Sequence, residues 1–165
     1  MKKVIIIGCP GSGKSTLARQ LHKVTKIPLV YLDMLFWNAD KTRVSKEEFR
    51  AKLNKELVRE SWIIDGNYGS TMELRMSACD TIIFLDYPTE ICLDGIKARR
   101  GKPREDMPWV ENEDEIDEEF IEFIKNYNTD SRPKVLELLT KHSDKKIYVF
   151  KSREEADLFL DEYTK

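Results

Sequence analysis

The stretch GCPGSGKST, residues 8–16, constrains the fold of this chain more than any other part of the sequence. Gly8, Gly13, Lys14 and Ser15 match the pattern G-x-x-x-x-G-K-[ST], whose backbone N–H groups surround phosphate oxygens. The apolar run KVIII precedes the loop, and apolar residues at helical spacing follow it. A strand, a glycine-rich loop and a helix in this order predict a site for the phosphates of a nucleotide.

The residue types of the loop suit this role. Its glycines allow a tight turn and a close approach to phosphate, and the helix that begins near Lys14 directs its positive end at the same anion. Lys14 is expected to contact the β- and γ-phosphates during transfer, and the Ser15 hydroxyl is expected to bind Mg²⁺. The residues of this loop that we expect to contact ATP are Gly8, Pro10, Gly11, Ser12, Gly13, Lys14, Ser15 and Thr16.

The rest of the chain alternates between short β-branched runs and helical patterns. Strands are predicted at 4–7, 28–33, 62–65, 81–86 and 146–150. This alternation predicts a single α/β domain over 1–165, with a parallel sheet and helices on both of its faces. Capping boxes at Ser45–Glu48 and Ser152–Glu155 each predict the start of a helix.

Three of the predicted strands end in aspartate, at the edge of the sheet where ligands bind. Asp33 is expected to orient or deprotonate the hydroxyl of a phosphoryl acceptor. Asp65 precedes a glycine and is expected to hold Mg²⁺ through water. Asp86 lies just before Pro88 at a helix start, so capping of that helix explains Asp86 better than a role in ligand binding does.

A basic run, KARRGKPR at 97–104, is followed by the acidic run ENEDEIDEEFIE at 111–122. Arginine makes bidentate contacts with phosphate, so the basic run is interpreted as a lid over the triphosphate. A solvated loop and a nucleic-acid patch stay open as alternatives. The acidic run is interpreted as the outer face of a helix.

Composition limits the other function classes. The net charge of −2 over 165 residues argues against bulk affinity for nucleic acid, which stays unlikely without being excluded. No apolar run is long enough to cross a membrane. An odd number of cysteines without a signal peptide predicts reduced thiols in the cytoplasm, and the oligomeric state stays open between monomer and dimer. The cysteines have no metal-ligand spacing. A redox role for Cys9 stays open beside its interpretation as a tolerated small residue.

At this point the sequence resembles the adenylate kinase-like group of P-loop phosphotransferases, through GCPGSGKST, Ile64-Asp65-Gly66 and the pair Arg99-Arg100. Within that group, YLD-x-LFW, IDGNY and DTIIFLDYP most resemble the proteins labelled DNA topology modulation proteins. The resemblance implies a three-layer P-loop NTPase fold with a five-stranded parallel sheet of order 2-3-1-4-5. It also implies an acceptor-binding segment at about 33–60 and a short lid at about 99–115.

The same resemblance implies roles for single residues. Asp65 would lie on the magnesium side, Arg99 and Arg100 would act in catalysis by stabilising the transferred phosphoryl group, and Lys151 and Arg153 would lie near adenine. The Asp-Gly-Asn-Tyr sequence here replaces the Asp-Gly-Phe-Pro-Arg of adenylate kinases, which puts AMP as acceptor in doubt. Asp33 looks more like the acceptor-binding carboxylate of shikimate-type kinases.

Candidate acceptor contacts follow the second and third strands. Phe36, Trp37 and Tyr68 could equally belong to the core, and Arg75 could equally pair with Glu73 or Asp80. The residues expected to contact the acceptor are Asp33, Trp37, Arg50, Asp65, Gly66, Asn67, Tyr68 and Arg75.

Together these patterns predict an ATP- and Mg²⁺-dependent kinase acting on a small molecule or a nucleotide, with the acceptor unidentified. The alternative is a nucleotide-binding regulatory protein that affects DNA topology without a small-molecule acceptor.

Overall fold

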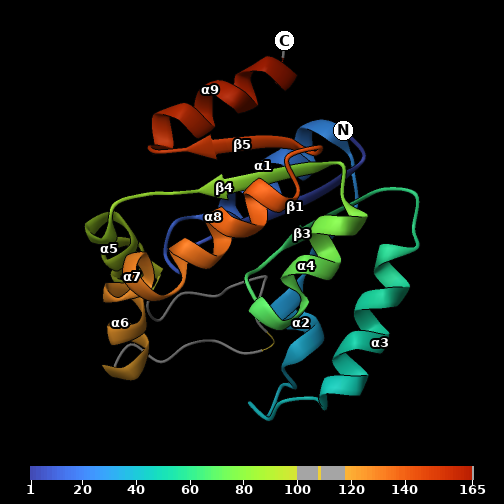
Figure 1. Ribbon diagram of the computed structural model, residues 1–165, viewed down its shortest axis with the longest axis horizontal. Coiled ribbons are helices and arrows are strands. Elements are labelled where there is room, and N and C mark those ends of the chain that lie inside the picture. Colours follow the sequence, from blue (N-terminus) through green and yellow to red (C-terminus); the bar gives the residue numbers. More distant parts are fainter. Residues whose placement is uncertain (100–107, 109–117, 165) are drawn as a thin grey trace.

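The computed structural model describes residues 1–99, 108 and 118–164, and within these ranges its core is one parallel β-sheet. The strands are β1 (Lys3–Gly8), β2 (Leu29–Tyr31), β3 (Trp62–Asp65), β4 (Thr81–Leu85) and β5 (Lys146–Phe150). Their order is β2-β3-β1-β4-β5, and every pair is parallel (Figure 1). The order predicted from the sequence is therefore confirmed.

Helices surround this sheet. The first five are α1 (Lys14–Thr25), α2 (Leu32–Phe36), α3 (Lys46–Leu57), α4 (Gly69–Ala78) and α5 (Thr89–Arg99). The others are α6 (Glu118–Lys125), α7 (Tyr127–Asp130), α8 (Arg132–Lys141) and α9 (Arg153–Thr164). Among the described residues no helix is long and apolar enough to cross a bilayer.

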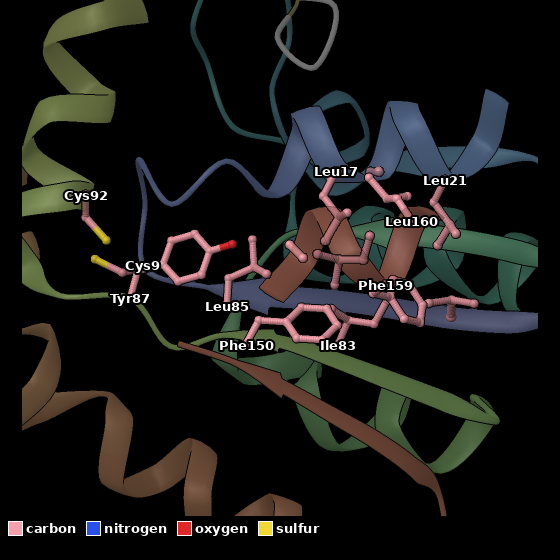
Figure 2. Packing of buried hydrophobic residues seen from close by; sticks show 14 of the residues in the cluster. Cys9, Leu17, Leu21, Ile83, Leu85, Tyr87, Cys92, Phe150, Phe159 and Leu160 are labelled. Carbon is pink, nitrogen blue, oxygen red and sulfur yellow. The ribbon is translucent and has the colours of Figure 1, made fainter. Parts of the chain in front are cut away.

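The two faces of the sheet are buried under different helices, because successive side chains of a strand point in opposite directions. Val4 and Ile6 of β1 pack in one cluster with side chains of α1, α5 and α9 (Figure 2). Ile5 and Ile7 pack in the other cluster with side chains of α3, α4 and α8. Both faces of β1 are fully buried, which explains its continuous apolar run.

The second strand is shorter than its sequence predicts. It was expected to run to Asp33, but β2 ends at Tyr31 and α2 begins at Leu32. Leu32, Leu35 and Phe36 follow helical spacing and turn one apolar face to the core. Asp33 therefore lies in the first turn of a helix, where a negative charge is favoured, and not at the end of a strand.

Both predicted capping boxes are confirmed as helix starts. The side chain of Ser45 accepts a hydrogen bond from the backbone N–H of Glu48 at 3.1 Å. The side chain of Ser152 accepts one from the N–H of Glu155 at 3.3 Å, and the Glu155 carboxylate accepts the N–H of Lys151 at 2.7 Å. The second box fixes the start of α9 next to the phosphate loop.

Asp86 has a different role from the helix cap that its sequence position suggests. Its carboxylate accepts two hydrogen bonds from the Arg132 guanidinium, both at 2.9 Å, and one from the Lys151 ammonium at 2.5 Å. Both of its oxygens are engaged in this way. The ion pairs join the end of β4 to the start of α8 and to the loop after β5.

The predicted lid at 99–115 lies almost wholly outside the described residues, and so does Arg100. The predicted acceptor segment at 33–60 contains α2, an isolated bridge between Trp37 and Arg43, and α3.

Backbone contact joins the phosphate loop to α5. A methyl group built on Gly95 would overlap the carbonyl oxygen of Gly11, and one built on Gly11 would overlap the carbonyl oxygen of Cys92. Gly11 also has φ +86°, a value that residues with a side chain rarely adopt. Only glycine at both positions lets the loop and the helix approach this closely.

We therefore expect Gly95→Ala to lower the free energy of unfolding by about 1–3 kcal/mol, because the added methyl forces the loop and α5 apart. The matched control is Gly69→Ala in α4, where nothing lies within 4 Å of the added group. That control should change stability by less than about 0.5 kcal/mol. Urea unfolding measures both, and equal midpoints for the two variants would contradict the contact.

The Asp86 ion pairs make stability depend on pH. Burial raises the pKa of Asp86, but the hydrogen bonds from Arg132 and Lys151 outweigh it and hold that pKa below its usual value. The stabilisation is therefore present above about pH 4 and is lost as the pH falls through the lowered pKa of the folded state.

Asp86→Asn should accordingly lower the free energy of unfolding by about 1–2 kcal/mol at pH 7, since both cations are partly exposed and screened. The difference from the wild type should shrink as the pH falls below about 4. Thermal unfolding at a series of pH values measures it. A difference that stays constant from neutral to acidic pH would show that the ion pairs do not stabilise the fold.

Candidate functional site

A cavity of about 710 Å³ opens at the carboxyl ends of β1, β2 and β3. The phosphate loop forms one wall, and residues that follow β2 and β3 form the other. Residues from α5, α6 and α9 complete the lining. The sequence-predicted residues that line it are Pro10, Gly11, Gly13, Lys14, Ser15, Thr16, Asp33, Asp65, Gly66, Asn67, Tyr68, Arg99 and Arg153.

The phosphate loop has the backbone of an anion-binding turn. Gly13 adopts φ +96° directly before α1, and the N–H of Ser12 donates to the carbonyl of Cys9 at 3.1 Å. The Ser12 hydroxyl is buried and has no hydrogen-bond partner among the described residues. An oxyanion in the loop would supply that missing acceptor.

Lys14, the first residue of α1, has its ammonium group in this loop. Its Nζ donates to the carbonyl oxygen of Cys9 at 3.4 Å. Burial lowers the pKa of Lys14, and the negative charge of Asp65 opposes that shift. A desolvated cation of this kind interacts more strongly with phosphate than a solvated one does.

Ser15 and Asp65 meet on the floor of the cavity. The parallel register of β1 and β3 pairs Ile6 with Asp65, so the carboxylate lies beside the phosphate loop. The Ser15 hydroxyl donates to Asp65 Oδ2 at 2.6 Å, and Asp65 is only 5% exposed. A hydroxyl and a carboxylate form the oxygen donor set that Mg²⁺ prefers.

The turn after β3 holds this carboxylate in place. The Asn67 side chain bonds both backbone groups of Gly8, accepting its N–H at 3.1 Å and donating to its carbonyl at 2.6 Å. The Asn67 side-chain amide thus bonds Gly8 as the backbone of a neighbouring strand would, and it joins the turn to the start of the phosphate loop. It was expected to contact the acceptor, and its amide group is engaged with Gly8 instead.

Arg75 lies beneath the same turn and is fully buried. Its guanidinium donates to the carbonyl oxygens of three consecutive residues: Gly66 at 3.0 Å, Tyr68 at 3.1 Å, and Asn67 between them. Burial lowers the pKa of Arg75 to about 9 while Asp65 opposes the shift, so the group is a cation at neutral pH.

This position corrects the expected partners of Arg75. Its hydrogen bonds go to the turn and to the hydroxyl of Thr71, whereas Glu73 pairs with Lys141 and Asp80 accepts backbone N–H groups near the start of β1. The cavity lining does not include Arg75.

Asp33 and Tyr68 meet in the part of the cavity lining that follows β2 and β3. The Tyr68 hydroxyl donates to Asp33 Oδ1, and the Tyr68 ring packs against Phe36 and Phe49 with centroids 4.7 and 5.3 Å away. Burial and the Asp33 charge raise the pKa of Tyr68, so the phenol keeps its proton. Phe36 therefore belongs to the core, while Tyr68 has one side in the core and its hydroxyl on Asp33.

Besides Arg75, three predicted acceptor or adenine contacts do not line the cavity, and neither do Gly8 and Ser12 of the phosphate loop. Trp37 packs edge-on against Phe36 with the Arg43 guanidinium 5.7 Å from its ring centre, and Arg50 is exposed on α3. The Lys151 ammonium is engaged with Asp86. These positions differ from the predicted acceptor and adenine contacts, because long side chains can point away from a site that their backbone adjoins.

Six lining residues were missed by sequence reasoning: Arg19, Tyr31, Gly95, Ala98, Phe120 and Phe123. Arg19 follows Ser15 by four residues, so one helical face carries both, and that spacing was a usable signal. The two phenylalanines come from α6, far along the chain. Only the fold brings them to the phosphate loop.

The strand order, the phosphate loop and the Ser15–Asp65 pair define a P-loop nucleotide-binding protein. A family model described as AAA domain matches residues 4–122, so the chain belongs to that family. No curated protein sequence matches the chain significantly.

Solved structures support the fold. The chain is similar to shikimate kinase from Acinetobacter baumannii in complex with shikimate, with a TM-score of 0.61, 15% identity, and coverage of 99% of this chain and 93% of that one. It is also similar to shikimate kinase from Bacteroides thetaiotaomicron, with a TM-score of 0.57, 15% identity, and coverage of 96% and 94%. At this identity the likeness establishes the fold of P-loop kinases.

Since Arg75 holds three buried carbonyl groups, we expect Arg75→Met to lower the free energy of unfolding by about 3–4 kcal/mol. Arg50→Met, on the exposed face of α3, is the control and should cost less than about 0.5 kcal/mol. Urea unfolding of both variants measures the difference. An unchanged stability of Arg75→Met would show that its hydrogen bonds to the turn do not stabilise the fold.

Proposed function

We propose that this protein is an ATP- and Mg²⁺-dependent kinase that transfers the γ-phosphoryl group to a hydroxyl of a small molecule. One observation carries the proposal: a single continuous cavity joins the phosphate loop to the carboxylate of Asp33. A nucleotide-binding switch needs only the first wall of that cavity. A kinase needs both, because donor and acceptor must meet in line.

The residues present fit ATP and Mg²⁺. The loop amides, the Lys14 ammonium and the unsatisfied Ser12 hydroxyl form a cradle for the β- and γ-phosphates. Ser15 would hold Mg²⁺ directly and Asp65 would hold it through water. When bound, the metal neutralises charge on the phosphate oxygens, and ATP supplies the phosphoryl group.

The chain's own residues then have separate tasks. Lys14 holds the phosphates, and Arg99, at the end of α5, faces the same cavity and stabilises charge on the transferred group. Asp33 accepts the hydrogen bond of the acceptor hydroxyl and orients it. Tyr68 donates to Asp33, which fixes the orientation of the carboxylate.

Water must be kept from the phosphoryl group, since otherwise ATP would be hydrolysed. Phe120 and Phe123 of α6 contribute apolar surface to the cavity. Phe123 is 46% exposed, a large exposure for a phenylalanine. We infer that both rings cover the cleft when an acceptor is bound.

The acceptor class remains a small hydroxyl compound. One structural neighbour was solved with shikimate, which is such a compound. The Asp33–Tyr68 pair suits hydroxyl groups, since a carboxylate accepts their hydrogen bonds. Within the described residues no observation favours the alternative of a regulator of DNA topology.

Two substitutions test the proposal, scored as ADP release with ATP, Mg²⁺ and a panel of hydroxylated metabolites. Lys14→Ala should lower acceptor-dependent turnover by about 100-fold or more and also weaken ATP binding. Asp33→Asn should lower turnover by a similar factor with a much smaller effect on ATP affinity, because Asp33 follows β2 and is not part of the phosphate loop. The matched control is Asp40→Asn, an exposed residue of the 33–60 segment, which should behave like the wild type.

Wild-type turnover by Lys14→Ala would exclude the proposed mechanism. A parallel titration with duplex DNA at physiological salt distinguishes the kinase from the alternative, a nucleotide-binding regulator of DNA topology. Tight DNA binding that responds to ATP, without any acceptor-dependent ADP release, would favour the regulator.

A further inference from the structure

The proposed phosphoryl transfer uses none of the three thiols, yet two of them lie together. Cys9 is the second residue of the phosphate loop and Cys92 lies on α5, and both are buried in one cluster. Figure 2 shows their sulfur atoms facing each other. The two thiols are close enough for each to shift the pKa of the other. Cys79 is remote from this pair, in the other cluster, with its thiol on the carbonyl of Met76 at 3.2 Å.

The surroundings of the two thiols differ. The hydrogen bond to Cys92 and burial raise the pKa of Cys9, so it keeps its proton. The hydrogen bond from Cys9 lowers the pKa of Cys92, and the charges of Lys14 and Arg153 add to this effect against burial. Cys92 is therefore the member that ionises first, and a thiolate is the reactive form of cysteine.

The backbones hold the thiols in reach of each other. Gly11 and Gly95 bring the loop and α5 into direct backbone contact, with the carbonyl of Cys92 against Gly11. Because these glycines leave no space between the segments, Cys9 and Cys92 cannot drift apart while the fold is intact. A disulfide requires Cβ atoms about 3.8 Å apart, and this backbone contact brings the segments that carry the two cysteines together.

We propose that Cys9 and Cys92 form a reversible disulfide under oxidation by a hydroperoxide, and that the oxidised protein binds ATP more weakly. The Cys92 thiolate attacks one peroxide oxygen, the O–O bond breaks, and Cys92 becomes a sulfenic acid as hydroxide leaves. The Cys9 sulfur then attacks the Cys92 sulfur, the S–O bond breaks, and the departing hydroxide takes the Cys9 proton as water. The two thiols lose two electrons in total, and hydrogen peroxide is reduced to two waters.

The effect on ATP follows from what Cys9 holds. Its carbonyl oxygen accepts both the Lys14 ammonium and the N–H of Ser12. A bond that draws Cys9 toward α5 moves this carbonyl, and with it the groups that surround the phosphates. By linkage, bound ATP must disfavour the disulfide to the same extent that the disulfide disfavours ATP.

The experiment uses the full chain, reduced or treated with hydrogen peroxide, and needs no acceptor. Peptide mass spectrometry should find one Cys9–Cys92 disulfide with Cys79 still a thiol. Calorimetric titration with ATP and Mg²⁺ should show about a tenfold weaker affinity after oxidation, restored by dithiothreitol. ATP present during peroxide treatment should slow the reaction.

Three variants serve as controls. Cys79→Ala should behave like the wild type in every measurement. Cys92→Ala and Cys92→Ser should bind ATP normally and keep that affinity after peroxide, and either one suffices if the other folds poorly. Failure to find the Cys9–Cys92 bond, or an unchanged ATP affinity once it has formed, would overturn the proposal. The two measurements are formation of the disulfide and affinity for ATP. Neither depends on kinase turnover, so failure of the proposed function would not affect the test of the disulfide.

Discussion

The site depends on a buried carboxylate between two cations, the fully buried Arg75 and the partly exposed Lys14. Asp65 opposes the desolvation of both Lys14 on the phosphate loop and Arg75 under the following turn, as the direction of its effect on each pKa indicates. Removing any one of the three charges would leave the others uncompensated in a medium of low polarity. The Ser15 hydroxyl donates a hydrogen bond to the same carboxylate. The phosphate loop, the proposed metal position and the turn after β3 are thus stabilised as one electrostatic unit.

A second constraint couples the loop to α5. The backbone contact between Gly11 and Gly95 leaves no space for a side chain, so a displacement of the loop must also move the helix. Arg99 lies one turn further along α5 and faces the cavity. In the proposed mechanism, the phosphates and the arginine that stabilises them are therefore positioned by the same contact. The Cys9–Cys92 pair lies beside that contact, so a covalent bond between the two cysteines would displace the phosphate loop directly.

Sequence reasoning predicted the fold well, because the strand residues are buried on both faces and their apolar runs are continuous. It predicted the Ser15–Asp65 meeting for the same reason, since both lie next to regular elements whose register follows from strand order. It was wrong about the end of β2, where α2 begins at Leu32, and about Asp86, which pairs with Arg132. At both places the local sequence allows either structure, and contacts with residues distant in the sequence select one of them. The direction of long side chains such as Lys151 could not be predicted from the sequence either. A motif specifies the course of the backbone, but it does not specify that the Lys151 ammonium will bind the carboxylate of Asp86.

The proposed acceptor end is not independent of the phosphate end. Residues 65–68 present Asp65 to Ser15 at one side of the turn and the Tyr68 hydroxyl to Asp33 at the other. Arg75 binds the three carbonyl groups between these two contacts. A shift of the turn would therefore alter both groups together, which keeps the distance from the phosphoryl donor to the acceptor hydroxyl nearly constant. In the proposed mechanism, in-line transfer requires that constancy, and the buried arginine beneath the turn after β3 would provide it.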